Sequence, residues 1–190
     1  MNSTNLAIIV AVVVVAAAVG IWLALRARRT RKLHSRFGTE YERTVGEIGS
    51  RSKAEHALLE REQRVKALPL RDLDPAERQG FVDHWSRLQA EFVDDPQASI
   101  VHADVLVGDV MKARGYPVAD FEQRAADISV DHPIVVDNYR RAHAIAMRRN
   151  EGAGSTEDLR QAMVHYRTLF EDLTRAPQES GGSAPAAESP

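Results

Sequence analysis

The pattern of apolar and polar residues divides the chain into one uninterrupted apolar segment and a series of shorter amphipathic ones. Residues 6–25 read LAIIVAVVVVAAAVGIWLAL and contain no charged side chain. A helix of this length spans about 30 Å, the thickness of a bilayer's hydrocarbon core. Twelve of these residues are Leu, Ile or Val, which together favour membrane insertion by about 4 to 7 kcal/mol. We predict a short leader over residues 1–5 and a transmembrane helix over residues 6–25.

Two other interpretations of the apolar segment receive less weight. A buried helix of a soluble protein does not need so long an uncharged run. A cleaved signal peptide normally has positive charge before its apolar run and a small-residue cleavage site after it. Here the leader has no charged side chain. The apolar segment also continues for seven residues beyond the candidate cleavage site, Ala16 to Ala18. An exported protein with a cleaved or reversed anchor stays an open alternative.

A cluster of cations directly after the apolar run predicts its orientation. Because positively charged flanks stay cytoplasmic, we expect a single-pass protein of the inner (plasma) membrane, with its N-terminus outside and its soluble domain in the cytoplasm. Trp22 lies near the inner boundary, where an indole ring reaches lipid headgroups. The cations either contact anionic lipid, at up to about 1 kcal/mol each, or only set the topology. They are Arg26, Arg28, Arg29, Arg31, Lys32 and Arg36.

Residues 26–68 form a basic neck with 12 Lys or Arg against six Glu. Thr39 and Glu42 have the spacing of a capping box, which predicts a helix that starts there. The second half of the neck reads AEHALLEREQRVKAL, a strong helix former with few apolar positions and no sustained heptad. We therefore predict a charged helical neck that ends in a solvated stalk helix, which could rest on the domain through Leu58, Leu59 and Val65.

Residues 69–175 alternate between helix-start signals and amphipathic patterns, which predicts a soluble domain. Asp74–Pro75 and Asp95–Pro96 each place a capping residue before a proline at the first helical position. The helix after Asp95 is apolar around most of its circumference, so we expect it to be central. Further helices are predicted from about Val118 to Ile128, from Asp131 and Pro133 onward, and from Ser155 and Asp158 to Leu173.

No run in the chain alternates with period two over the length of a strand. The prediction is an all-α protein whose soluble domain is a compact bundle of about five helices. Residues 176–190 are rich in Pro, Gly and Ser, and we expect this tail to be disordered.

Composition and motifs exclude several kinds of chemistry. Residues 69–175 carry 13 Lys or Arg against 19 Asp or Glu, so this acidic domain is a poor candidate for binding nucleic acid. The absence of cysteine excludes disulfides and thiolate chemistry. Neither a GxSxG motif nor a glycine-rich phosphate loop occurs, and no two histidines have the spacing of a zinc-binding helix. We predict no enzyme activity, no catalytic residue, no cofactor and no metal.

One loop residue is a candidate for contact with a partner. Tyr116 lies between Gly115 and Pro117, where its ring could be presented at the surface. The preferred alternative is that the ring folds back and closes the helix end against the core.

Three stretches carry a resemblance: HSRFGTEYERTV, VMKARGYPVADFEQRAADISVDHP and STEDLRQAMVHYRTLFEDL. They resemble a family of uncharacterised bacterial single-pass membrane-anchored helical proteins, from the basic neck to Leu173. The resemblance implies that the domain is one unit. It implies no activity and supplies no functional residue.

The function that these patterns favour is a non-enzymatic helical domain at the cytoplasmic face of a membrane, acting as a protein-interaction or scaffold module. Its partners would be the bilayer and an unknown protein, and not nucleic acid. The alternative is a ligand- or metal-dependent sensor or enzyme, with a pocket between helices lined by His102, Asp104 or His143.

Overall fold

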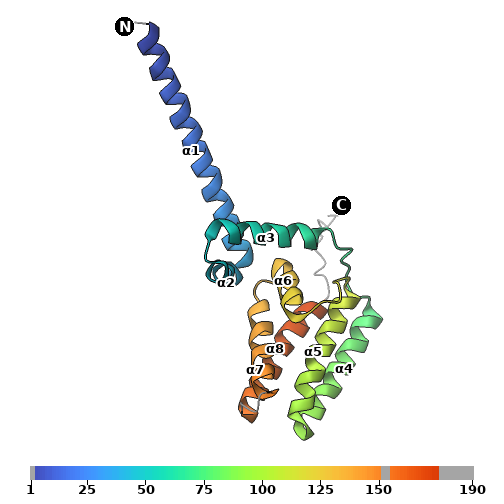
Figure 1. Cartoon of the computed structure of the whole chain (residues 1–190). Coiled ribbons are helices and arrows are strands. Elements are labelled where there is room, and N and C mark those ends of the chain that lie inside the picture. The colour runs from blue at the N-terminus through green and yellow to red at the C-terminus, as the bar shows by residue number, and fades with distance from the viewer. Residues whose placement is uncertain (1–2, 151–154, 176–190) are drawn as a thin grey trace, which may run out of the picture. The chain divides into compact units, whose positions relative to one another are not determined.

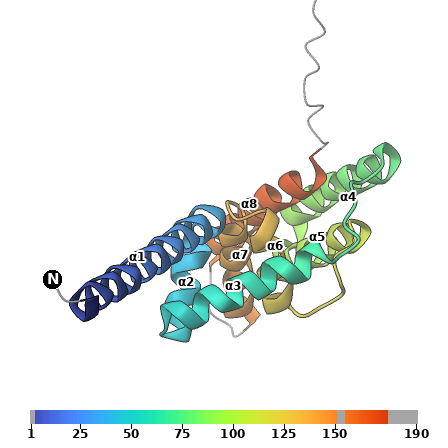
Figure 2. The ribbon, with the colours of Figure 1, turned by 90° about the horizontal axis from the view of Figure 1, so that it is seen from above.

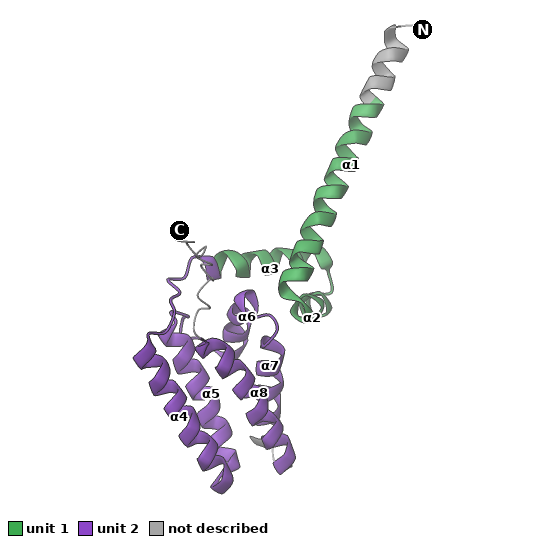
Figure 3. Cartoon of the chain, turned by 180° about the vertical axis from the view of Figure 1, so that it is seen from behind, with its two compact units in different colours: residues 1–64 green, residues 65–190 purple. Residues whose placement is uncertain are grey.

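The structure is a computed structural model that describes the backbone of residues 3–150 and 155–175, and the side chains of residues 12–148 and 155–175. The described part of the chain contains eight helices and no strand (Figure 1), which confirms the all-α prediction. It divides into two compact units, Met1–Arg64 and Val65–Pro190 (Figure 3). The start of the predicted leader, the predicted tail and the break at residues 151–154 lie outside the described residues.

Helix α1 (Ser3–Phe37) dominates the first unit and joins the predicted anchor to the basic cluster without a break. Large apolar side chains from Val12 to Leu25 are 49% to 62% exposed, all around the helix. The side chains of residues 6–11, part of the predicted transmembrane segment, lie outside the described set. Among the residues that are described, no helix has an apolar stretch long enough to cross a membrane.

Helices α2 (Thr39–Ile48) and α3 (Arg51–Lys66) gather at the C-terminal end of α1 (Figures 1 and 2). The spacing of Thr39 and Glu42 predicts a capping box, but this prediction is wrong. Gly38 occupies the N-cap and supplies no side-chain hydrogen bond. The chain turns at Gly38 because its φ of +52° is a conformation that glycine adopts at little steric cost.

The second half of the neck is less solvated than a stalk. Ala54 and Leu58 of α3 are fully buried, and Glu62 is 5% exposed. In α2, the buried carboxylate of Glu40 pairs with the guanidinium of Arg61 in α3 at 2.9 Å. Ion pairs and buried side chains thus tie α3 into the fold. The sequence pattern singled out Leu58 for packing, but it missed the ion pairs because their partners come from other helices.

The described residues of the second unit form five further helices, in agreement with the predicted bundle. Asp74 caps α4 and Ser155 caps α8, each in a reciprocal capping box, and Asp95 caps α5. These local signals predicted the three helix starts correctly. The helices are α4 (Pro75–Asp94), α5 (Pro96–Ala113), α6 (Phe121–Asp131), α7 (Val136–Asn150) and α8 (Thr156–Thr174).

The structure corrects the boundaries of the two middle helices. Helix α6 starts at Phe121 rather than near Val118, because the side chain of Asp120 accepts a hydrogen bond from the backbone N–H of Gln123. Asp131, predicted to begin the next helix, is the last residue of α6. The chain then turns through Pro133 before α7 begins.

Helix α8 packs against both α5 and α7. Helix α4 packs against α5 and also touches α8, and α6 packs on α7. The rings of Trp85 in α4 and Phe170 in α8 stack with centroids 4.8 Å apart. Helix α5 is less enclosed than its apolar circumference predicted, since Val101 and Val105 are 50% and 56% exposed.

Candidate functional site

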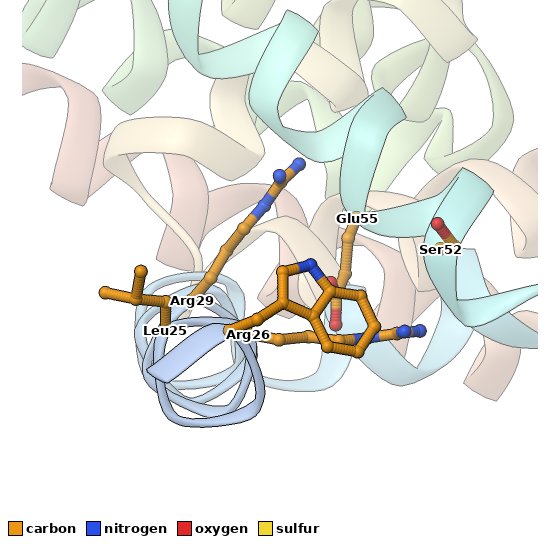
Figure 4. Close-up of a pocket in the computed structure, with 6 residues that line it drawn as sticks. Leu25, Arg26, Arg29, Ser52 and Glu55 are labelled. Carbon is orange, nitrogen blue, oxygen red and sulfur yellow. The ribbon is translucent and has the colours of Figure 1, made fainter. Parts of the chain in front are cut away.

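A cavity in the first unit lies where the apolar part of α1 meets its basic part. Its volume is about 330 Å³, and its lining residues come from α1 and α3: Trp22, Leu25, Arg26, Arg29, Ser52 and Glu55. The four residues from α1 share one face, because they lie three, four and seven positions apart. Figure 4 shows the side chain of Glu55 reaching from α3 toward α1, and Arg26 and Arg29 leaving α1 in different directions.

Two glycine turns bring α3 back to α1. Gly38 ends α1, and Gly49 ends α2 in the left-handed conformation, with φ of +69°. The N–H of Gly49 donates to the carbonyl of Val45 at 2.9 Å, which closes the last turn of α2. Side chains that are distant in sequence thereby meet at one level of α1.

Glu55 is the fixed polar element of the cavity wall. It is 5% exposed, and its Oε1 accepts hydrogen bonds from the hydroxyl of Thr30 at 2.7 Å and from that of Tyr41 at 3.0 Å. Burial raises the pKa of Tyr41, and the hydrogen bond to Glu55 adds to the shift. Tyr41 therefore stays a neutral donor. No hydrogen bond within the described residues uses the other carboxylate oxygen, Oε2.

The structure separates the six cations that the sequence singles out for lipid contact. Arg36 pairs with the buried Glu62 at 3.3 Å, so it serves the fold. The guanidinium of Arg26 lies 5.4 Å from the ring centre of Trp22, a cation–π contact. Of the six, only Arg26 and Arg29 line the cavity. The other three, Arg28, Arg31 and Lys32, are exposed and form no ion pair within the described part of the chain.

Ser52 and Glu55 are the site residues that sequence reasoning missed. Both belong to a polar stretch whose spacing does not reveal which side faces another helix. The only available signal was the pair Gly46 and Gly49, which marks a possible reversal of the chain but not its direction.

Tyr116, the predicted partner contact, is only 4% exposed. Burial is the main cause that raises its pKa to about 12. Its backbone N–H donates to the carbonyl of Met111 at 3.0 Å, as in a closed helix end. The ring thus follows the preferred alternative and closes α5 against the core, and it offers little surface to a partner.

A second polar cluster joins four helices of the second unit. Oδ1 of Asp104 in α5 lies 3.3 Å from the hydroxyls of Tyr139 in α7 and Tyr166 in α8, and both hydroxyls donate to it. Its Oδ2 pairs with Arg124 of α6 at 2.9 Å. Both tyrosines are fully buried, and burial raises the pKa of each. They stay neutral and act as donors.

A cavity of about 280 Å³ adjoins this cluster. Asp104 and Arg124 line it together with Asp109 and Lys112, so that its wall carries two acids and two bases. Nε of Arg124 is buried and has no hydrogen-bond partner among the described residues. Gly108 makes room for the guanidinium, since a Cβ there would lie 2.8 Å from a terminal nitrogen of Arg124.

The histidines named for the alternative function are not brought together. The ring of His102 lies on the exposed side of α5 next to Glu91, at 3.6 Å. The ring of His143 stacks on Phe121 with centroids 3.6 Å apart, and burial lowers its pKa. Among the residues described, no group of three or more acidic or histidine side chains has the arrangement of a metal site.

Comparisons of the chain with protein-family models, with curated proteins and with solved structures find no match. The resemblance noted in the sequence therefore stays a prediction.

Proposed function

We propose that α1 anchors this protein in the inner (plasma) membrane as a single-pass helix, with the N-terminus outside and the helical second unit in the cytoplasm. The observation that carries the proposal is the exposure of the apolar side chains from Val12 to Leu25 on every side of α1. Contiguous exposed apolar surface of this kind marks contact with a membrane or with another protein. A complete apolar circumference, followed by a cluster of cations, favours the membrane.

The soluble unit would act as a protein-interaction or scaffold module held close to the membrane, where tethering raises its local concentration. We place interaction ahead of catalysis because the sequence contains neither a GxSxG motif nor a glycine-rich phosphate loop. Recovery of a stoichiometric partner from membranes in mild detergent supports this role, and its repeated absence would count against it.

The anchor is tested by extraction of membranes with alkaline carbonate. The natural protein is expected to stay in the membrane pellet. The double variant Val14→Lys/Val19→Lys adds about 5 to 7 kcal/mol to the cost of insertion, which offsets the predicted gain, and it should appear in the soluble fraction. Val101→Lys/Val105→Lys makes the same change at two exposed valines of α5 and should stay in the pellet. Natural protein in the soluble fraction contradicts the proposal.

Orientation is tested with reporters fused after Arg175. A reporter that folds only in the cytoplasm should be active there, and one that is active only outside the inner membrane should be silent. The reverse result would support the alternative of an exported protein with a reversed anchor.

A second candidate function is ligand sensing by the cavity beside Asp104 and Arg124. The buried Nε of Arg124 has no hydrogen-bond partner within the part of the chain that the structure describes, which favours this function, because a carboxylate or phosphate would satisfy such a donor. Elemental and mass analysis of the purified protein tests for a retained ligand or metal ion. A stoichiometric one would place sensing ahead of scaffolding.

A further inference from the structure

The cavity between α1 and α3 changes in character along the axis of α1. Trp22 and Leu25 belong to the apolar run, and Arg26 and Arg29 begin the basic segment. Such a wall offers apolar contact at one end and positive charge at the other. Its volume of about 330 Å³ lies within the range of small-molecule pockets, about 300 to 1,000 Å³.

The depth of the cavity relative to a bilayer follows from the helix rise. Thr30, which donates to Glu55, lies five residues beyond Leu25, or about 7.5 Å along the axis. The headgroup layer on each side of the hydrocarbon core is about 5 to 8 Å thick. If Leu25 marks the edge of the core, the carboxylate of Glu55 is at the depth of the lipid headgroups. This step rests on the proposed membrane anchor.

The charges of the wall restrict which headgroup fits. Arg26 and Arg29 suit a phosphate, because a guanidinium binds phosphate oxygens with charge-assisted hydrogen bonds. The buried Glu55 opposes a ligand that brings only negative charge. Its Oε1 is held by Thr30 and Tyr41, so the carboxylate cannot easily turn away. The free Oε2 instead suits a cation that donates hydrogen bonds.

We propose that this cavity binds a phospholipid whose headgroup carries a phosphate and a primary ammonium, as in phosphatidylethanolamine. The phosphate pairs with Arg26 and Arg29, whose exposed side chains turn toward it from the different directions that Figure 4 shows. The ammonium donates to Oε2 of Glu55 and to the hydroxyl of Ser52. The glycerol end lies against Trp22 and Leu25. A choline headgroup lacks N–H donors for Glu55, and a glycerol headgroup lacks the positive charge. Both should bind more weakly.

The test uses Trp22 as a local probe in the full-length protein. Trp85→Phe leaves Trp22 as the only tryptophan, since the chain has two. This protein is reconstituted into phosphatidylcholine vesicles that contain a minority of lipid brominated on its acyl chains. The headgroup of the brominated lipid is ethanolamine, glycerol or choline. Quenching of Trp22 fluorescence then reports which headgroup is enriched beside the cavity.

The expected apparent association of the ethanolamine lipid exceeds that of the choline lipid by about fivefold. Glu55→Gln should abolish this preference and improve binding of the glycerol lipid, while its amide oxygen still accepts the hydrogen bonds from Thr30 and Tyr41. Arg26→Gln/Arg29→Gln should weaken binding of both the ethanolamine lipid and the glycerol lipid. Arg28→Gln/Arg31→Gln is the matched control, because it removes the same charge outside the cavity and should leave the ethanolamine preference unchanged.

Equal quenching by all three lipids overturns the inference, as does a preference of the natural chain for the glycerol lipid. An equal loss in the control and the cavity variants also overturns it, because general electrostatic attraction would then explain the binding. Flotation of the vesicles separates this failure from failure of the anchor. If the protein floats with the vesicles but shows no lipid preference, only the present inference is contradicted. If the protein does not float with the vesicles, the membrane proposal is contradicted as well.

Discussion

The hydroxyl of Tyr41, in a side chain that is 1% exposed, donates a 3.0 Å hydrogen bond to the carboxylate of Glu55, fourteen residues further along the chain. The bond links α2 to α3 and holds the carboxylate at the wall of the cavity. A buried carboxylate loses its hydration and needs such donors. Tyr41 therefore stabilises the turn of the chain and also sets the chemistry of the candidate lipid site.

Tyr41→Phe should loosen α3. It removes one of two donors to Glu55 and should cost about 1 kcal/mol of local stability. We expect the backbone amides of α3 to exchange with deuterium about fivefold faster in the reconstituted protein. Glu60→Gln is the control, since it alters an exposed pair with His56 on the same helix. Unchanged exchange in Tyr41→Phe would show that the bond contributes no stability.

Asp104→Asn should destabilise the second unit by about 1 to 3 kcal/mol. The change removes the charge that pairs with Arg124 and weakens the acceptor for Tyr139 and Tyr166. Denaturant unfolding of a Trp22→Phe protein in detergent measures the effect, because the fluorescence then comes only from Trp85 in the core.

The matched control for this change is Asp109→Asn, an exposed acid on the same helix. A shift in the unfolding midpoint as large as that of Asp104→Asn would mean that helix charge, and not the buried cluster, determines stability.

Two glycine-to-alanine changes should act in opposite directions. Gly115 has φ of +96°, and a Cβ there would lie 2.6 Å from the backbone oxygen of Pro69. Gly115→Ala should therefore cost on the order of 2 kcal/mol or more. A Cβ on Gly80, within α4, meets nothing within 4 Å, so Gly80→Ala should stabilise the unit by about 1 kcal/mol. Thermal unfolding by circular dichroism compares the two, and a stabilising Gly115→Ala would contradict the turn geometry.

Acid should destabilise the second unit partly through two histidines. Burial lowers the pKa of His143 and of His165 in the folded state. The unfolded chain then binds more protons below the ordinary value of about 6.5, so the free energy of unfolding falls as the pH drops through that value toward the folded pKa.

The measurement is unfolding by denaturant between neutral pH and about pH 5.5. The double variant His143→Gln/His165→Gln should show a flatter dependence on pH than the natural chain. Equal slopes in the two proteins would refute the assignment.

Local rules were enough to predict much of the helical structure. Asp74, Asp95 and Ser155 each cap a helix through a backbone N–H three residues further on. Such short-range interactions depend only on residues that are close together in the sequence. For this reason the predictions of these three helix starts were correct. The all-α class followed for the same reason, from the helical spacing of apolar residues.

The sequence by itself thus determined the starts of α4, α5 and α8, the apolar run and the cations that follow it. It could not determine which side of α3 faces α1, because Glu55 and Thr30 lie 25 residues apart. Their contact depends on the turns at Gly38 and Gly49. The directions of these turns are fixed only when buried groups such as Glu55 and Tyr41 form their hydrogen bonds. The pairing of α5 with α8, and the cluster around Asp104, likewise formed only in the tertiary structure, since packing selects among many arrangements that local interactions leave open.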